Sequence, residues 1–217
     1  KEISGDPPHL ILFPEIKFKE KIFLKKVKEI TNKYGYCVIV ASEGIKNSKN
    51  KFLSDSGLKD SFGHAQLGGV APVLSELISS KLKYKVHWAV SDYLQRAARH
   101  IASKVDVDQA YSLGVKAITY AKNDISDVML TIKNISSKQK YKWSISHTSL
   151  DNVANVEKKL PKNFIKNNGF EITKACKEYI QNLIKGEDYP VYRSGFPIYA
   201  KLKCKTIKKS LPSYKLK

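Results

Sequence analysis

Arginine is almost absent from this chain, which carries nearly all of its positive charge on lysine. Only Arg96, Arg99 and Arg193 are arginine among the 39 basic residues, and the formal net charge is +19. Nucleic-acid-binding proteins usually gather their charge on one face and use arginine freely. Here the lysines are scattered along the whole chain, which is typical of a solvated surface. A basic nucleic-acid-binding module is therefore the least favoured interpretation, and we expect no nucleic-acid partner.

Long apolar runs and paired cysteines are missing as well. No apolar run approaches the roughly 20 residues that a membrane span needs, and the first residues have no signal-peptide layout. Cys37, Cys176 and Cys204 lie far apart and form no CxxC pair, which argues against a metal site or a disulfide framework. These patterns predict a globular, cytoplasmic protein with reduced thiols and no membrane partner.

What the sequence does contain is an alternation of strand and helix patterns. Residues 9–13 and 37–41 are short apolar runs, and between them apolar residues recur at helical spacing up to Gly35. Strand, helix and strand within some 30 residues predict a βαβ unit, and hence a parallel sheet. Further strands are predicted at residues 85–90 and 128–132. Further helices are predicted to end near three residues: Leu82, Ala121 and Gly186.

The helix that ends near Ala121 has the clearest pattern, and the end of the chain has the least regular one. Asp106 and Gln109 resemble a capping box, which predicts where this helix begins. An apolar stripe follows them at helical spacing. The tail after Gly186 is rich in proline and tyrosine, and we expect it to wrap the surface. The fold class predicted from these elements is α/β.

Polar side chains follow two of the predicted strands. Glu43 follows residues 37–41 with only Ser42 between, and Tyr93 and Arg96 come after residues 85–90. In open α/β sheets, ligands bind beyond the carboxyl ends of the strands. A carboxylate accepts hydrogen bonds from hydroxyl groups, and a guanidinium holds an oxyanion with a planar fork that lysine lacks. The pattern therefore favours a site for a phosphorylated, polyhydroxylated small molecule.

Each of these residues also has a purely structural interpretation. Arg96 or Arg99 could form an internal ion pair, for instance with Asp92 or Asp106. Glu43 could cap a helix or line a loop. The glycine-rich stretch GHAQLGG is no GxGxxG fingerprint and lacks the P-loop lysine, so the sequence offers no evident loop for nucleotide phosphates.

Two motifs in this order carry a resemblance to a known family. The stretch SEGI (42–45), followed by DYLQRAARHIASKVDVDQAY (92–111), resembles a phosphofructokinase, closest to the diphosphate-dependent kind. The similarity runs nearly end to end and includes NVANVEKKLP, the GFEIT helix and GEDYP. The resemblance implies a phosphofructokinase-like fold, a three-layer sandwich around a parallel sheet.

The resemblance also implies a ligand, fructose 6-phosphate. Glu43 matches the family glutamate that contacts the sugar hydroxyls. Tyr93 and Arg96 match the family's YxxR pair, with Arg96 on the 6-phosphate. His87 falls where some relatives place an arginine donated by a neighbouring subunit, and a histidine there would be a shorter, titratable contact to phosphate.

Other family motifs cannot be found in this chain. They are the GGDG-like phosphate loop, the TIDxD-like motif with the catalytic aspartate, and the MGR-like motif. In relatives they precede the segment that resembles HLILFPEI (9–16), so the chain resembles the carboxyl-terminal half and its fold is incomplete without an amino-terminal half. We expect a sugar-phosphate-binding domain at residues 1–100, a helix and strands that pack on the missing domain at 101–170, and a terminal helix and wrapping tail at 171–217.

The activity implied by the resemblance is transfer of a phosphoryl group from diphosphate to the 1-hydroxyl of fructose 6-phosphate, a step of glycolysis. The family uses Mg²⁺, whose ligands are not in this chain. We expect the chain alone to be inactive, because the catalytic aspartate and the donor-phosphate loop are absent. An ATP-dependent relative and a non-catalytic sugar-phosphate-binding subunit remain alternatives. The expected protein partner is an amino-terminal half or a further copy of the chain.

Overall fold

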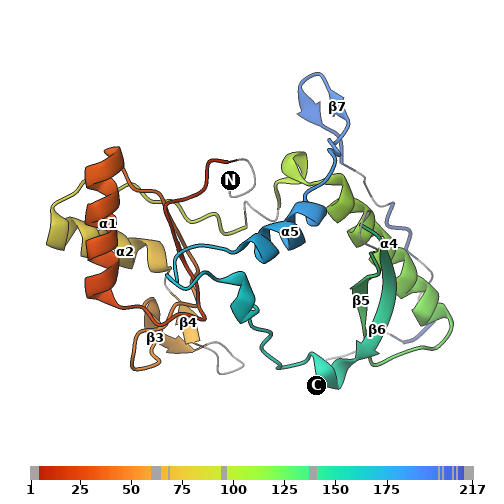
Figure 1. The fold of residues 1–217 in the computed structure, drawn as a ribbon. Coiled ribbons are helices and arrows are strands. Elements are labelled where there is room, and N and C mark those ends of the chain that lie inside the picture. The colour runs from red at the N-terminus through yellow and green to blue at the C-terminus, as the bar shows by residue number, and fades with distance from the viewer. Residues whose placement is uncertain are drawn as a thin grey trace.

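The fold was analysed in a computed structural model, drawn in Figure 1. The structure describes these residues: 5–59, 65–67, 69–93, 97–136, 141–199, 201, 203–206, 208 and 210–212. The helices are α1 (Glu20–Tyr34), α2 (Val70–Leu82), α4 (Lys104–Lys122) and α5 (Lys174–Leu183), with 3-10 turns η1 (Arg99–Ile101), η2 (Leu150–Asn152) and η3 (Lys162–Phe164). The strands are β1 (Leu10–Leu12), β2 (Ile39–Ala41), β3 (Asp55–Lys59), β4 (Ala65–Leu67), β5 (Val128–Asn134), β6 (Trp143–Ser149), β7 (Tyr192–Arg193) and β8 (Phe196–Pro197).

The predicted βαβ unit is confirmed. Strands β1 and β2 are parallel, with Leu10 opposite Ile39 and Leu12 opposite Ala41. Helix α1 joins them and buries Phe23 against the core. The helix ends at Gly35, which takes a left-handed conformation (φ 79°) and donates its N–H to the carbonyl of Thr31. This unit fixes where β2 ends, and therefore the position of Glu43 just beyond it.

Helix α2 covers the same core as α1. It buries three residues one turn apart, Val70, Leu74 and Ile78, which pack in one apolar cluster with β1 and α1. The helix has Pro72 in its first turn, where proline is tolerated because its missing N–H would have no partner within the helix. In Figure 1, α1 and α2 lie together with β1 to β4 in one part of the molecule.

The strand predicted at residues 85–90 is wrong. The segment is irregular, and among the described residues β2 has no strand neighbour other than β1. Tyr84 and Val86 are half-buried while Lys85 and His87 are exposed, so side chains alternate there, but residues 88–90 are all exposed as well. A strand also needs a ladder of backbone hydrogen bonds, and alternation alone does not supply one. The prediction was right about the alternation of side chains at residues 84–87 and wrong about the pairing of the backbone.

The second part of the molecule contains α4, α5, β5, β6 and the β7–β8 hairpin (Figure 1). Strand β5 includes the predicted strand 128–132 and pairs with β6 in antiparallel register. A small cluster of Phe13, Ile165, Ile172 and Cys176 links the end of β1 to the start of α5. The Ile11 N–H also donates to the carbonyl of Phe170, 2.9 Å away. These contacts join the two parts.

The predicted start of α4 is corrected by three residues. The N-cap is Ser103, whose Oγ accepts a hydrogen bond from the Asp106 N–H at 3.2 Å. Gln109, predicted to belong to the cap, is instead buried and donates Nε2–H to the hydroxyl of Tyr141 at 2.9 Å. Serine caps a helix better than aspartate placed one turn inside it, because its hydroxyl reaches the free N–H groups of the first turn.

Two further outcomes concern the tail and the membrane. The tail is mostly irregular, as expected, but it includes the short antiparallel hairpin β7–β8, which the sequence analysis did not predict. Within the described ranges, none of the helices combines the length and the apolar character that crossing a bilayer requires. The described elements form an α/β arrangement with both parallel and antiparallel strand pairs.

Candidate functional site

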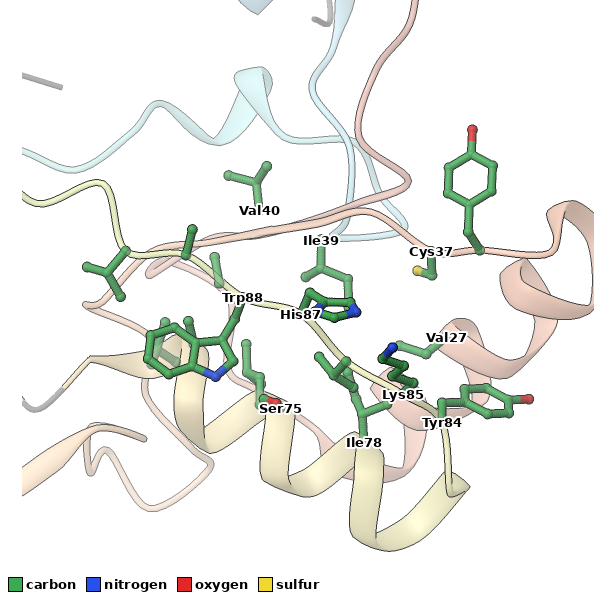
Figure 2. Close-up of a pocket in the computed structure, with 18 of the residues that line it drawn as sticks. Val27, Cys37, Ile39, Val40, Ser75, Ile78, Tyr84, Lys85, His87 and Trp88 are labelled. Atoms are coloured by element: carbon green, nitrogen blue, oxygen red, sulfur yellow. The ribbon is translucent and has the colours of Figure 1, made fainter. Parts of the chain in front are cut away.

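A cleft of about 1210 Å³ opens between β2, α2 and the segment 83–92. Its floor is apolar, as Figure 2 shows for Val27, Ile39 and Ile78. The segment 83–92 runs across the opening and carries His87 and Trp88, which Figure 2 shows among the side chains that line the cleft. The cleft exists because this segment crosses the face of α2 without pairing to β2.

Two of the predicted site residues line this cleft. Glu43 reaches it from the carboxyl end of β2, and His87 reaches it from the crossing segment. Both side chains are exposed, so they can contact a ligand without prior opening of the fold. The structure therefore brings a carboxylate and an imidazole to one cavity from residues 44 positions apart in the chain.

The turn after β2 presents Glu43. The Gly44 N–H donates to the Ser42 Oγ at 3.3 Å, and the Ser54 hydroxyl donates to the Glu43 carbonyl at 3.5 Å. A Cβ at Gly44 would lie 3.2 Å from the Cβ of Pro14, so the backbone passes close to the turn after β1. Glycine permits this close approach, and the turn keeps the Glu43 side chain at the rim.

The other two predicted site residues are Tyr93 and Arg96. Tyr93 is 70% exposed and follows Asp92, which lines the cleft, but Tyr93 is not part of the lining. Its carbonyl accepts a hydrogen bond from the Ala97 N–H at 3.0 Å. Arg96 lies outside the described residues. The predicted meeting of Glu43 with Arg96 therefore stays a prediction.

The structure adds two residues to the cleft that the sequence analysis did not assign to it. Trp88 is 54% exposed and forms part of one wall. Asp92 sits at the end of the crossing segment with a left-handed backbone (φ 41°), a conformation that aspartate tolerates better than most residues. The sequence signal for Asp92 was its position directly after an apolar run, the same signal that indicated Glu43.

Cys37 also lines the cleft, and its thiol is unreactive there. Burial raises the pKa of its thiol to about 11. At neutral pH the sulfur is therefore protonated and a poor nucleophile. This fits the reduced, structural thiol that its isolated position predicts.

Arg99 has the internal role that the sequence analysis left open. Its Nη2 lies 2.9 Å from Oδ1 of Asp188, and its Nη1 donates to the carbonyl oxygen of the same residue. The partner is neither Asp92 nor Asp106 but a residue 89 positions further along the chain. The planar fork of arginine is used here to hold a side-chain and a main-chain oxygen together.

Metal ligands do not gather in the part of the chain that the structure describes. No group of three or more histidine, cysteine, aspartate or glutamate side chains could hold an ion there. Mg²⁺ is often held by one or two carboxylates together with phosphate oxygens, so the described residues by themselves supply no complete site for it.

Comparison with known proteins finds extensive similarity to proteins of one kind. No family model matches the chain. It is 50% identical over 213 residues to a pyrophosphate–fructose 6-phosphate 1-phosphotransferase of Halomonas elongata, a match that covers 98% of this chain and 51% of the relative. A protein of the same name from Methylococcus capsulatus is 50% identical over 204 residues, covering 92% of this chain and 48% of the relative. Over nearly its whole length the chain is thus similar to about half of these phosphotransferases.

A solved structure shows the same similarity. The crystal structure of a pyrophosphate-dependent phosphofructokinase from Nitrosospira multiformis matches with a TM-score of 0.80 at 44% identity, over 99% of this chain and 51% of that one. The resemblance carried by SEGI and DYLQR is thus confirmed, and so is an α/β phosphofructokinase-like fold. The chain spans about half the length of the curated relatives it matches.

Proposed function

We propose that this chain supplies the fructose 6-phosphate side of a phosphofructokinase that takes its phosphoryl group from diphosphate. The observation that carries the proposal is 50% identity across 98% of the chain to a protein named for that reaction. The reaction transfers the terminal phosphoryl group of diphosphate to the 1-hydroxyl oxygen of the sugar phosphate and releases orthophosphate. Its place would be glycolysis, in the cytoplasm.

The residues we propose to bind the sugar phosphate are those that match the family motifs. Glu43 accepts hydrogen bonds from sugar hydroxyls, and Arg96 holds the 6-phosphate with its fork. Tyr93 and His87 add polar contacts to the same ligand. Support comes from the cleft, where Glu43 and His87 line one cavity, and from the net charge of +19, which favours anionic ligands over long range.

The chemistry itself we assign to the complete protein. Phosphoryl transfer depends on a metal and positioned groups around the moving phosphate. The described residues of this chain hold no metal-ligand cluster, and the chain lacks the family's aspartate motif. We therefore propose that Mg²⁺ and the diphosphate bind to the part of the complete protein that corresponds to the other half of its relatives. The finer architecture, a three-layer sandwich, belongs to the same proposal, supported by the parallel pair β1–β2 with α1 and α2 packed on one core.

Ligand binding to the chain tests the sugar-phosphate site. Fructose 6-phosphate should raise the melting temperature, whereas fructose and inorganic phosphate should not, separately or together. Glu43→Gln and Arg96→Ala should each abolish most of that shift. Glu76→Gln on α2 and Arg193→Ala on β7 are the matched controls, since both residues are exposed and lie outside the cleft.

The outcome decides between the candidate functions. If the control variants lose as much of the shift as the site variants, or if the sugar phosphate has no effect, the proposal is wrong. Binding of RNA with a steep salt dependence would instead favour the basic module. A non-catalytic sugar-phosphate-binding subunit is the alternative function. It would be supported if a separately produced amino-terminal half, mixed with this chain, gave no turnover with diphosphate or with ATP.

A further inference from the structure

The beginning of α4 is attached to the end of α5 by a row of contacts. The Ser103 hydroxyl donates to the Leu183 carbonyl at 2.7 Å, and the N–H groups of Lys104 and Val105 donate to the carbonyls of Gly186 and Lys185 at 3.0 and 3.2 Å. Arg99 also makes its two contacts to Asp188, which follows these residues in the chain. Two chain segments 80 to 89 residues apart are thereby fixed to each other.

Among the residues that make these contacts, Arg99 is the nearest in sequence to the residues of the candidate site. It is the first residue of η1, and the N–H of Ala97, two residues earlier, donates to the carbonyl of Tyr93. Tyr93 in turn follows Asp92, which lines the cleft. A short path of covalent and hydrogen bonds therefore leads from the rim of the cleft to the Arg99–Asp188 pair.

We propose that Arg99 is a positioning residue, which holds the rim segment that carries Tyr93 by clamping it to Asp188. The inference rests on the proposed binding of fructose 6-phosphate, because it assigns the clamp a role at that site. It also explains why arginine stands here in a chain of lysines. One guanidinium reaches both the carboxylate and the carbonyl of Asp188, and an ammonium group has no such fixed fork.

The position of the clamp predicts a local rather than a global effect. The contacts of Ser103, Lys104 and Val105 to α5 do not involve Arg99, so α4 and α5 stay attached when Arg99 is removed. The Arg99 and Asp188 side chains are 34% and 30% exposed, outside both apolar clusters. Loss of the pair should therefore loosen residues 97–102 and leave the cores intact.

Four variants of the full chain separate the contacts. Arg99→Ala removes both, Arg99→Lys keeps the charge without the fork, and Asp188→Asn removes the ion pair but keeps the carbonyl acceptor. The double variant Arg99→Ala with Asp188→Ala tests whether the two residues act as one unit. Lys174→Ala is the matched control, because it breaks an exposed ion pair with Glu178 on α5 that is remote from the rim segment.

Two measurements on each variant test the inference. In fructose 6-phosphate titrations, Arg99→Ala should weaken binding about tenfold, as expected when a preorganised site loses its support. Arg99→Lys should restore only part of the affinity, and the double variant should bind no worse than Arg99→Ala. By hydrogen exchange, Arg99→Ala should speed exchange at residues 97–102 and not in α1. Lys174→Ala should match the wild type in both.

The inference and the proposed function can fail separately. Unchanged affinity and unchanged exchange at residues 97–102 in Arg99→Ala would overturn the clamp. Faster exchange throughout the chain would also overturn it, since that would make the pair a general structural support. If the wild type does not bind fructose 6-phosphate, the proposed function is wrong and so is the role at that site. The clamp as a local restraint would then be decided by the exchange data.

Discussion

At the scale of single residues, glycine positions give the sharpest test of the described geometry. Gly186 and Gly195 both have left-handed backbones, with φ of 75° and 84°. A Cβ at Gly186 would lie 2.9 Å from the Cβ of Lys104, whereas a Cβ at Gly195 would meet nothing within 4 Å. The two sites therefore share the backbone strain of a substitution and differ in the clash.

We expect Gly186→Ala to lower the free energy of unfolding by about 2–3 kcal/mol, the sum of left-handed strain and overpacking. Gly195→Ala should cost only about 1 kcal/mol, because strain acts alone there. Urea denaturation of both variants measures the difference. Equal losses would mean that the end of α5 does not lie against the start of α4 as described.

At this scale, prediction from sequence succeeded where one residue determines the local backbone conformation. It failed where a side chain's contact lies far along the chain. Gly35 ends α1 because glycine takes the left-handed conformation at little cost, and that is readable from one position. The partner of Arg99 was not readable, because Asp188 becomes its neighbour only through the attachment of α4 to α5. The ion pair itself was among the stated alternatives, but its partner was not.

At the scale of elements, the capping of α4 is the feature that the sequence analysis misplaced and that can be tested. The Ser103 hydroxyl accepts from the Asp106 N–H and donates to the Leu183 carbonyl, so one side chain both caps α4 and holds α5. Ser103→Ala should destabilise the chain by about 1–2 kcal/mol, since it leaves both backbone groups without this partner. Urea denaturation measures this loss.

Ser80→Ala on α2 is the control for Ser103→Ala. The Ser80 hydroxyl only donates to the Leu77 carbonyl of its own helix, an exposed contact that a helix does not need. This variant should lie within about 0.5 kcal/mol of the wild type. If Ser103→Ala is as mild, helix α4 has another N-cap than the one described.

Whole elements were predicted best where the local pattern suffices. Helices α1 and α2 follow from apolar spacing and their end signals, and the β1–β2 pair follows from the short crossover between them. Residues 85–90 show the limit, because a strand also needs a partner that the sequence of the segment does not name. For the candidate site, the strand-end pattern indicated Glu43, which lines the cleft, and Tyr93, which does not. His87 was indicated by the family resemblance alone, and Trp88 was missed because it is part of the segment wrongly predicted as a strand.

At the scale of the whole molecule, the outer face of α4 is the feature that a complete fold should cover. Tyr111, Val115 and Ile118 recur at helical spacing and are 75%, 53% and 65% exposed. Val115 and Ile118 also line a shallow hollow of about 440 Å³ on this helix. An apolar stripe of this kind is typical of a surface that contacts another protein surface. The sequence analysis expected this helix to pack on an amino-terminal domain.

We expect the isolated chain to self-associate through this stripe, because burial of apolar surface is the favourable term available to it. The double variant Val115→Lys with Ile118→Lys should shift the chain toward the monomer in size-exclusion chromatography with light scattering. It should also weaken association with a separately produced amino-terminal half. Val191→Lys, a similar change at a more exposed valine before the β7–β8 hairpin, is the control and should change neither. If the double variant associates as the wild type does, the face of α4 is not the contact surface, and the contact must be sought on another face.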